Sequence, residues 1–493
     1  MESKIPRELD RLFDTLLGAD KRLLYEQIGR KLPHHIRFNP LKGPLEAQQA
    51  LFREQGFEFE PLPGQPGIFR ILHQPYPIGK SLSHFLGHIY VQDTASMIPA
   101  LILNPRPGDW VLDMAAAPGS KTTQMGTMME NRGVILANDV ASKRLRALSQ
   151  NLQRMTLCNG VLYKWYGEQF GNAYFEMFDR VLLDPGCSGL GTLHKNPEVL
   201  GWWNWNYCER LAVRQRNLIT SAIKALRPGE ILTYSTCTLT PIENEAIVDF
   251  ALREFPVEVV PIELPGIRTW PGLTEFEGTT YHPSLARTLR MYPLDNITEG
   301  FYVACLRKTD SLKPPRLKKP ITPTPMGFLS RKNSPVKKYL DYLTEHFRIP
   351  EAVWQSYVYL MGTNSITFCS REMEAFPFYA RPLQTGLPLV ATMDRGAKLT
   401  TEGCHLIGQH AQRHVIDIED LPTLQRFVNR EEMDIPVEGK GQIIVRYRGC
   451  VIGYGLADGG RLKSQFPKAE WPFRLVDPEQ TVPKDNGGSN KLS

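Results

Sequence analysis

The sequence predicts an α/β fold with a buried parallel sheet at its centre, and two patterns lead to this prediction. Between about residues 85 and 308, short apolar runs alternate with amphipathic helical segments. Such alternation is typical of βαβ units, which bury a parallel sheet between layers of helices. Several of the apolar runs also end in an acidic residue or are followed by a cysteine. Ligands bind at the carboxyl ends of strands in folds of this class, so we expect a functional site there.

The strands follow from the apolar runs, and the helices between them from a spacing of three to four residues. Leu145, Leu148 and Leu152 have this helical spacing, which predicts a helix after Asp139. The expected strands are 110–113, 133–139, 178–184 and 229–237, with two later ones at 257–260 and 301–306.

The composition is that of an ordinary globular protein. The 493 residues are 42% hydrophobic and 22% charged, with a net charge of +6, which permits a nucleic-acid partner without requiring one. No apolar run is long enough to cross a membrane and the N-terminus lacks a signal peptide's apolar region, so we expect a cytoplasmic protein. The eight cysteines form no CxxC pair and no zinc-type cluster with histidines, so we expect reduced thiols and no metal.

Changes in composition along the chain predict six segments. They are an N-terminal extension (1–84), the α/β domain (85–308), a basic proline-rich linker (309–335), a small α+β unit (336–395), a β-rich domain (396–478) and a disordered tail (479–493). Residues 60–67, rich in proline and glycine, are expected to form a turn. Residues 442–457 are expected to form a β-hairpin.

A run of small residues follows the first expected strand. Small side chains let the backbone approach a ligand closely, and Ser120 is expected to cap a helix whose positive end favours a carboxylate. The order of residues differs from that of dinucleotide- and ATP-binding loops, which disfavours NAD and ATP, and a plain strand-to-helix turn is the alternative. The run is Ala115, Ala116, Ala117, Pro118, Gly119, Ser120 and Lys121.

An acidic residue and two cysteines end the next expected strands. Asp139 ends the second strand, where it could accept hydrogen bonds from ribose hydroxyls or cap the following helix. Asp184 and Cys187 follow the third strand, and Cys237 follows the fourth. A single cysteine after a strand is usually an inert core residue. Two cysteines beside a ligand-binding loop instead indicate a shared catalytic site.

These motifs resemble those of the RNA (cytosine-5) methyltransferases of the NOL1/NOP2/Sun family. DMAAAPGSKTTQ, which begins at Asp113, is similar to the family's cofactor motif, and DPGCSG and YSTCTL are similar to its two cysteine motifs. The upstream segments RFNPLK and YVQDTASM also fit. The C-terminal segments GYGLA and GRLK are similar to the bacterial RsmF-type branch, whose members modify small-subunit ribosomal RNA and end in a PUA-like RNA-binding domain.

The resemblance implies a Rossmann-like class I S-adenosylmethionine methyltransferase domain between an N-terminal α+β extension and a C-terminal PUA-like β-rich domain. It implies that Cys237 is the nucleophile that adds to C6 of cytosine, that Cys187 assists product release and that Asp184 contacts the base or the cofactor. The loop from Ala115 to Lys121 would hold the methionine part of S-adenosylmethionine, and Asp139 would hold its ribose. Such covalent catalysis makes C5 of the cytosine reactive toward the methyl group.

Three positions, Tyr166, Pro185 and Gly186, depart from the family pattern. Tyr166 stands where members of this group usually have an aspartate that contacts the adenine amino group. Its ring could stack on adenine, or its phenol could replace one hydrogen bond. Pro185 and Gly186 stand where the family commonly has Ala-Pro, although Asp184 and Cys187 keep their spacing.

The resemblance also makes RNA the expected partner. Arg37 and Lys42 near the N-terminus and four C-terminal residues could neutralise phosphates, with a solvated surface charge as the alternative for each. The four are Arg446, Arg448, Arg461 and Lys463. We expect a monomer that acts on small-subunit (16S) ribosomal RNA, free or in the small ribosomal subunit. A tRNA cytosine-5 methyltransferase and a ribosome-assembly factor that binds RNA without catalysis are the alternatives.

Overall fold

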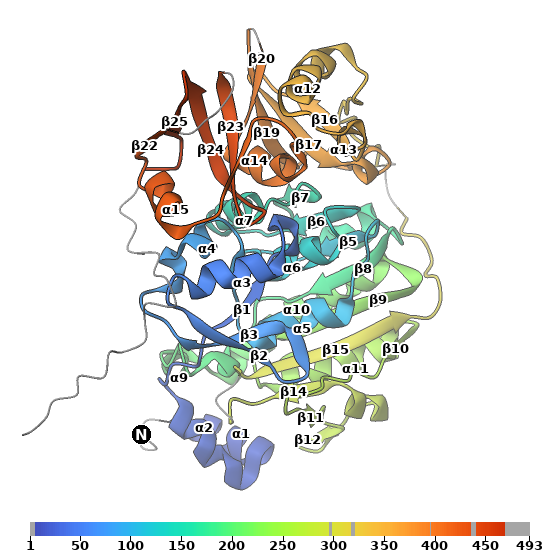
Figure 1. Cartoon of the computed structure of the whole chain (residues 1–493). Helices are drawn as coiled ribbons and strands as arrows, with labels where there is room; N and C mark the ends of the chain where they lie inside the picture. The colour runs from blue at the N-terminus through green and yellow to red at the C-terminus, as the bar shows by residue number, and fades with distance from the viewer. Residues whose placement is uncertain (1–4, 295–297, 317–320, 395, 435–439, 469–493) are drawn as a thin grey trace, which may run out of the picture.

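A ten-stranded mixed sheet lies at the centre of the computed structural model, which describes residues 5–294, 298–316, 321–394, 396–434 and 440–468. In Figure 1 this sheet fills the middle of the molecule, with strands β1–β4 beside it and two further sheets above it. The predicted disordered tail, 479–493, lies outside the described residues.

Parallel strands form the middle of the central sheet in the order β7-β6-β5-β8-β9, and antiparallel strands extend both edges. The predicted strands are confirmed, with small shifts at their ends. Because β5, β8 and β9 are neighbours, Asp113, Asp184 and Cys237 lie along one edge of the sheet. The strands are β5 (Trp110–Asp113), β6 (Val134–Asn138), β7 (Gly160–Tyr163), β8 (Phe178–Leu183), β9 (Leu226–Thr236), β10 (Val257–Val259), β11 (Trp270–Pro271), β14 (Leu289–Met291), β15 (Phe301–Lys308) and β18 (Gln384–Thr385).

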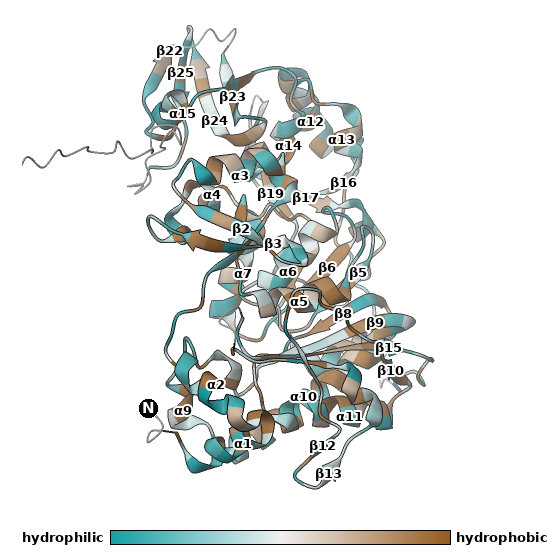
Figure 2. Ribbon diagram, turned by 60° about the horizontal axis from the view of Figure 1, so that its bottom comes forward, coloured by the Kyte–Doolittle hydropathy of each residue, from teal (hydrophilic) through white to brown (hydrophobic). Residues whose placement is uncertain are grey.

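Helices cover both faces of the central sheet because its inner strands are apolar on both sides, as the brown of β5 and β6 in Figure 2 shows. One face packs against α5, α6 and the predicted helix α7, and the other against α8, α10 and α11. No helix in the described ranges is both long and apolar enough to span a membrane. The helices of this part are α5 (Thr94–Leu103), α6 (Ser120–Met128), α7 (Ser142–Arg154), α8 (Phe170–Ala173), α9 (Val199–Trp202), α10 (Trp205–Ala225) and α11 (Glu245–Glu254).

The N-terminal extension contains a small antiparallel sheet in the order β2-β3-β1-β4. The predicted turn at 60–67 is wrong in extent, because β2 and β3 occupy most of it and only Pro63 and Gly64 reverse the chain. Proline is tolerated here because β2 is an edge strand. The elements are α1 (Arg7–Leu17), α2 (Lys21–Gln27), β1 (His35–Phe38), α3 (Leu45–Arg53), β2 (Glu58–Leu62), β3 (Gln65–His73), α4 (Leu82–Phe85) and β4 (Ile89–Val91).

The C-terminal part contains two sheets, in the orders β16-β17-β19-β20 and β21-β23-β24-β25-β22. The predicted hairpin at 442–457 is confirmed as β23 and β24. The hairpin of β19 and β20 spans the boundary expected at 395/396. The elements are α12 (Ser334–Phe347), α13 (Glu351–Gln355), β16 (Tyr357–Met361), β17 (Ser365–Ser370), β19 (Leu387–Met393), β20 (Gly396–Leu399), α14 (Thr401–Ile407), β21 (Val415–Ile418), α15 (Leu421–Val428), β22 (Glu432–Asp434), β23 (Gly441–Tyr447), β24 (Cys450–Asp458) and β25 (Arg461–Ser464).

A buried carboxylate joins the C-terminal sheet to the N-terminal extension. Glu54 accepts a hydrogen bond of 3.1 Å from the Tyr447 hydroxyl and forms an ion pair of 2.7 Å with Arg448. Leu51 and Leu82 of the extension share an apolar cluster with Phe427 and Ile443 of the C-terminal part. The five-stranded C-terminal sheet therefore docks on the extension through both apolar and charged contacts.

A second buried ion pair, between Arg290 of β14 and Glu245 of α11, predicts a large effect on stability. Its nitrogen and oxygen atoms lie 2.5 and 2.6 Å apart, and both side chains are almost completely buried. Arg290→Met leaves the Glu245 carboxylate buried without its partner, so we expect a loss of about 3–5 kcal/mol in the free energy of unfolding. Denaturation in urea, followed by circular dichroism, measures this change.

The matched control is Arg253→Met, which breaks the pair between Asp249 and Arg253, whose side chain is 58% exposed. A pair with one solvent-exposed partner of this kind is worth less than about 1 kcal/mol. Equal losses of stability in the two variants would contradict the assignment of Arg290 as a buried, paired charge.

Candidate active site

Two adjoining cavities open at the carboxyl edge of the central sheet. The larger, of about 390 Å³, is lined by Lys121, Asp184, Cys187 and Cys237 among others. The smaller, of about 190 Å³, is lined by Asp139 and by residues of α10. Ala115, Arg144, Pro185 and Gly186 line both cavities, so the two form one continuous site. In the described ranges, no group of three or more His, Cys, Asp or Glu side chains could hold a metal ion.

Polar contacts hold the loop of small residues after β5 in place. The Asn138 side chain donates to the carbonyls of Met114 and Trp165 at 3.1 and 3.0 Å and accepts from the Trp165 backbone amide at 2.8 Å. From α7, Arg144 donates to the carbonyl of Ala117, and Asn151 donates to that of Pro118. The loop is therefore fixed before a ligand arrives, and its small side chains leave the cavity open.

The start of α6 differs from the expectation for Ser120. The helix begins at Ser120 itself, Gly119 occupies the capping position, and no side chain caps this end. Gly119 adopts a left-handed φ of 106°, and a Cβ there would lie 2.7 Å from Leu148. The correction has a physical reason, since glycine is the residue that fits both this backbone conformation and this close approach.

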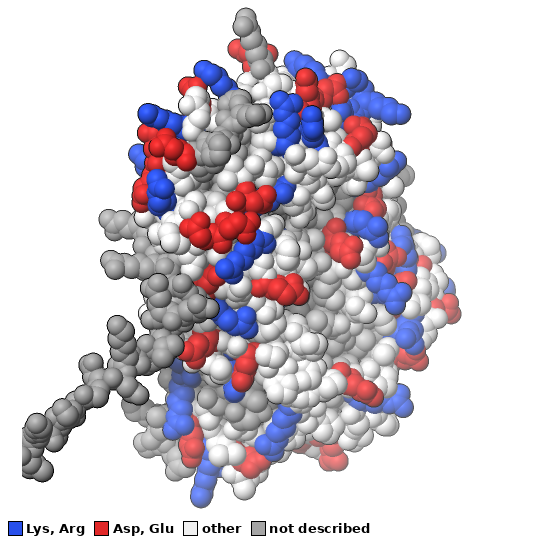
Figure 3. All heavy atoms as spheres, viewed as in Figure 1, with Lys and Arg blue, Asp and Glu red and all other residues white. Residues whose placement is uncertain are grey.

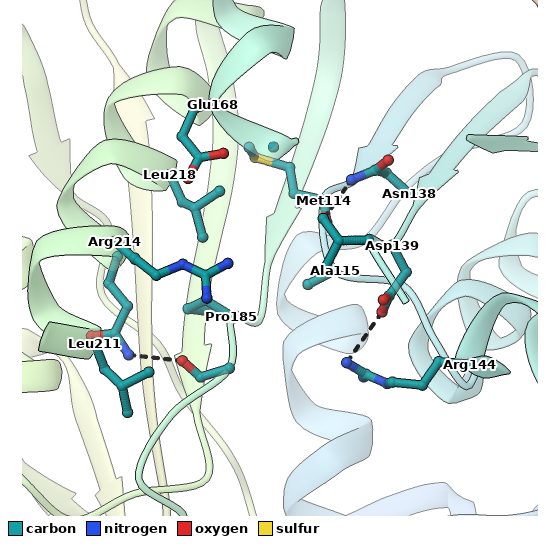
Figure 4. Close-up of a pocket in the computed structure, with 14 residues that line it drawn as sticks. Met114, Ala115, Asn138, Asp139, Arg144, Glu168, Pro185, Leu211, Arg214 and Leu218 are labelled. Atoms are coloured by element: carbon teal, nitrogen blue, oxygen red, sulfur yellow. Dashed lines mark hydrogen bonds and ion pairs between the residues drawn. The ribbon is translucent and has the colours of Figure 1, made fainter. Parts of the chain in front are cut away.

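Asp139 lines the smaller cavity, and one of its carboxylate oxygens has no hydrogen bond. Its Oδ1 accepts from the Ala141 amide at 2.9 Å, which stabilises the turn into α7. Its Oδ2 is buried without a hydrogen bond and lies 3.3 Å from the Arg144 guanidinium, the ion pair dashed in Figure 4. Buried acceptors are normally satisfied, so this oxygen fits the hydroxyl donors of a ribose.

The wall opposite Asp139 comes from α10, which sequence reasoning missed. Figure 4 shows Leu211, Arg214 and Leu218 of this helix facing Ala115 and Asp139 across the cavity. Tyr166 was predicted to contact adenine, but its side chain is 67% exposed, and it is not among the residues that line either cavity. The adjoining Gly167 and Glu168 line the smaller cavity instead.

In the larger cavity, Asp184 is held by two donors. Lys121 Nζ lies 2.6 Å from one carboxylate oxygen, and the Ser235 hydroxyl donates to the other at 2.8 Å. Burial alone would lower the pKa of Lys121, but Asp184, together with the nearby Asp113 and Cys237, outweighs burial and raises that pKa above its usual value. The pair therefore presents an ammonium and a carboxylate beside the cysteines.

The structure brings the two predicted cysteines together. Their sulfur atoms lie 3.1 Å apart, and both are free, partly exposed thiols. The hydrogen bond with Cys237, together with burial, raises the pKa of Cys187 well above its usual range, so Cys187 stays protonated at neutral pH. Negative charge on Cys237 contributes to the raised pKa values of Lys121 and Lys195. Lys121 and Lys195 therefore place two ammonium groups in the same cavity as Cys237.

Glu243 holds the two cysteine loops in register. Its carboxylate accepts from the Ser188 amide and from the Thr240 hydroxyl, each at 2.9 Å. Gln215 donates at 3.1 Å both to this carboxylate and to the Gly186 carbonyl. Because Ser188 follows Cys187 and Thr240 follows Cys237 closely, one buried side chain positions both sulfur atoms.

A further ion pair in the larger cavity was not predicted. Lys195 Nζ lies 2.5 Å from Glu299 Oε2, and both residues line the cavity with Cys237. Glu299 lies outside the cysteine motifs, and nothing in the local sequence shows that it reaches the cysteines. The contact depends on the long-range pairing of β15 with β9.

The basic residues predicted to contact RNA near the N-terminus are buried. Arg37 donates to Gln92 and to Thr123, and it lies over the Tyr90 ring. Lys42 is 4% exposed, and burial lowers its pKa to about 7. Arg37 therefore braces α6 in this structure, and neither residue is open to a phosphate.

The four C-terminal basic residues divide into two pairs. Arg446 donates to the carbonyls of Gly408 and Ala411, and Arg448 pairs with Glu54, so these two hold the fold together. Arg461 and Lys463 on β25 are exposed. Figure 3 shows acidic and basic side chains intermixed over the face in view, without one continuous basic surface.

Comparisons with known proteins agree with this geometry. The family model for 16S rRNA methyltransferase RsmB/F matches residues 100–307, and that for the methyltransferase RsmF PUA domain matches residues 413–470. The chain is 30% identical to the ribosomal RNA small subunit methyltransferase F of Vibrio vulnificus over 93% of its length and 94% of the relative's. It is 40% identical to the tRNA (cytosine(49)-C(5))-methyltransferase of Pyrococcus abyssi over 62% of its length and 97% of the relative's.

A solved structure of a methyltransferase homolog protein from Pyrococcus horikoshii superposes with a TM-score of 0.55 and 34% identity, covering 61% of this chain and 93% of that one. The fold and the site thus define a Rossmann-like, S-adenosylmethionine-dependent methyltransferase with a C-terminal PUA domain. Within that class, the chain belongs to the 16S rRNA methyltransferase RsmB/F family.

The unsatisfied oxygen of Asp139 leads to a prediction about cofactor binding. Asp139→Ala removes a charged acceptor for ribose hydroxyls, and such hydrogen bonds are worth about 1.5–3 kcal/mol, so we expect S-adenosylmethionine to bind about 10- to 100-fold more weakly. Isothermal titration calorimetry measures the change. Asp310→Ala, a remote exposed position, serves as the control. An unchanged affinity in Asp139→Ala would remove Asp139 from the cofactor site.

Proposed function

We propose that this protein transfers a methyl group from S-adenosylmethionine to C5 of a cytosine in RNA, with Cys237 as the covalent nucleophile. The observation that carries the proposal is the placement of the two cysteine sulfur atoms, 3.1 Å apart, beside the Lys121–Asp184 pair and the loop after β5. Neither cysteine is a sealed core residue, since both line the larger cavity.

The residues present fit S-adenosylmethionine. Asp139 offers its unsatisfied oxygen to the ribose, and the loop from Ala115 to Lys121 leaves room for the methionine part. Leu211, Leu218 and Met114 give the smaller cavity an apolar wall suited to the adenine. When bound, S-adenosylmethionine supplies a methyl group on a sulfonium, which is an electrophile.

Cys237 begins the reaction by adding its thiolate to C6 of the cytosine. The addition makes C5 electron-rich, as an enamine carbon is, and this covalent step replaces one difficult reaction with easier ones. Lys121 and Lys195 line the same cavity as Cys237. Asp184, held by Lys121 and Ser235, is placed to accept a hydrogen bond from a protonated N3 and so stabilises the charge of the adduct.

Cys187 assists the release of the product. It stays protonated at neutral pH, and its sulfur lies 3.1 Å from that of Cys237. A thiol in this position donates a hydrogen bond to the sulfur that leaves C6. The negative charge that returns to Cys237 is thereby stabilised as the carbon–sulfur bond breaks.

Small-subunit ribosomal RNA, free or in the small subunit, is the substrate that we propose. The Vibrio vulnificus relative named for that RNA aligns over 93% of this chain, and the RsmF PUA model matches residues 413–470. A tRNA is the second candidate, favoured by the higher identity, 40%, to the Pyrococcus abyssi tRNA enzyme over a shorter stretch. An RNA-binding assembly factor without catalysis is disfavoured by the assembled cysteine pair.

We also propose that the protein acts as a monomer. We propose in addition that the chain divides into an N-terminal extension (1–84), the α/β domain (85–308), a linker (309–335), a middle unit and the PUA-like domain. The β19–β20 hairpin supports moving the last boundary from 395/396 to the residues after Leu399. Arg461 and Lys463 are the proposed phosphate contacts that stay exposed. For Arg446, Arg448, Arg37 and Lys42 the structure supports roles within the fold instead.

Cys237→Ala tests the proposed activity. Incubation with tritiated S-adenosylmethionine and small-subunit RNA or tRNA should label the RNA with the wild-type protein and reduce the label at least about 1000-fold with the variant, because no adduct can form. Cys305→Ala, a buried thiol away from the cavities, is the control. Equal label in Cys237→Ala and wild type would exclude Cys237 as the nucleophile.

Cys187→Ala tests the release step. The variant keeps the nucleophile but lacks the donor beside it, so a covalent RNA–protein adduct should accumulate and run as a slow band on a denaturing gel. The adduct should be several-fold more abundant than with the wild type. Normal turnover without the adduct would remove Cys187 from the reaction.

A further inference from the structure

Glu299 is a buried carboxylate of the catalytic cavity that the steps above leave without a role. It lies just before β15 and is 4% exposed, yet it lines the larger cavity together with Cys237, Asp184 and Lys121. Its Oε2 is 2.5 Å from Lys195 Nζ, and Lys195 reaches the cavity from the loop that follows the Cys187 motif.

The backbone around Glu299 is held at the nucleophile. The Gly191 amide donates to the Cys237 carbonyl and the Gly300 amide donates to the Gly191 carbonyl, each at 2.9 Å. A Cβ on Gly191 would lie 1.8 Å from the Gly300 carbonyl oxygen, so the three segments are in direct contact. On the N-terminal side of Glu299, the hydroxyl of Thr298 donates a hydrogen bond of 3.0 Å to Asp93, which holds this part of the backbone in place.

The proposed reaction needs a base that the roles above do not supply. After methyl transfer, C5 carries both the new methyl group and its original hydrogen, and that proton must leave before the ring is restored. Cys187 stays protonated, so it donates and does not accept. Asp184, which accepts from Lys121 and Ser235, is assigned above to the protonated N3 on the ring and is therefore not free to take the C5 proton.

One other carboxylate lines the larger cavity, and its position suits it less. Asp113 ends β5 beneath the cofactor loop, is 1% exposed and accepts from the Thr122 hydroxyl at 2.7 Å. It therefore faces the proposed methionine side of the cavity. Glu299, beside the Cys237 backbone and Lys195, lies on the side where the cytosine would be held.

We propose that the Glu299 carboxylate, positioned by Lys195 and Asp93, takes the proton from C5 of the methylated adduct. The C5–H bond breaks and its electron pair forms the C5–C6 double bond. The bond between C6 and Cys237 sulfur breaks at the same time, and the sulfur keeps that pair as a thiolate. The proton passes to Glu299 and then to water, so atoms and electrons balance without a further reagent.

The charges around Glu299 suit a base that works near neutral pH. Burial and the nearby charge of Asp93 raise the pKa of Glu299 to about 7, while Lys195 and Lys121 oppose this rise. Asp184 and Cys237 also line the same cavity. Below pH 7 Glu299 is protonated and cannot accept the proton, so elimination should slow as the pH falls and level off above about pH 8.

The test follows the elimination step by itself and rests on the proposed function. Small-subunit RNA containing 5-tritiated cytidine is mixed with excess protein and with S-adenosylmethionine labelled with carbon-14 in its methyl group. Release of tritium to water is compared with adduct trapped by denaturation. The proteins are wild type, Glu299→Gln and, as the matched control, Glu258→Gln, whose surface carboxylate is about half exposed.

We expect Glu299→Gln to release tritium at least about 100-fold more slowly and to accumulate an adduct that carries both labels, without the pH dependence of the wild type between pH 6 and 8. Glu299→Asp keeps a carboxylate and should restore part of the rate and its pH dependence, which also controls for folding. Wild-type release in Glu299→Gln, or loss of the adduct itself, would overturn the inference and leave the proposed function standing. Absence of methyl transfer by wild type and control would overturn both.

Discussion

The pairing of β8 and β9 as neighbouring parallel strands is the constraint on which the site depends. Parallel neighbours end at the same edge of a sheet, so the residues that follow them meet there. Cys187 and Cys237 are fifty positions apart, yet their sulfur atoms come within 3.1 Å. Glu243 then accepts hydrogen bonds from Ser188 and Thr240, one in each loop, and so fixes the positions of the two thiols relative to one another.

Paired charges give the site its chemistry. Lys121 with Asp184 and Lys195 with Glu299 bring two ammonium groups and two carboxylates into one cavity. Charges are costly to bury unless they are paired, so the pairs support one another and hold the side chains still. The same arrangement gives the two cysteines different surroundings. The neighbouring sulfur and burial keep Cys187 protonated, and Cys237 shares its cavity with the ammonium groups of Lys121 and Lys195.

Two arginines that the sequence suggested for RNA binding, Arg446 and Arg448, instead help to hold the C-terminal part in the fold. Arg448 pairs with the buried Glu54, and Arg446 donates to the backbone carbonyls of Gly408 and Ala411. These contacts fix the β21–β25 sheet against the N-terminal extension. Arg37, on β1 of the same extension, in turn contacts the start of α6 beside the cofactor loop. The sheet proposed to hold RNA and the catalytic cavity therefore share a continuous set of contacts.

The sequence by itself determined the strands, the cofactor loop and the two cysteine motifs, because each is a local pattern of apolar, small or reactive residues. Tertiary structure decided which side chains meet. The wall formed by Leu211, Arg214 and Leu218, the Lys195–Glu299 pair and the burial of Arg37 and Lys42 depend on long-range packing, and one residue's charge does not reveal whether it faces water. Long-range packing also explains why Gly119, and not Ser120, is the capping residue of α6, since Gly119 packs tightly against Leu148 of another helix.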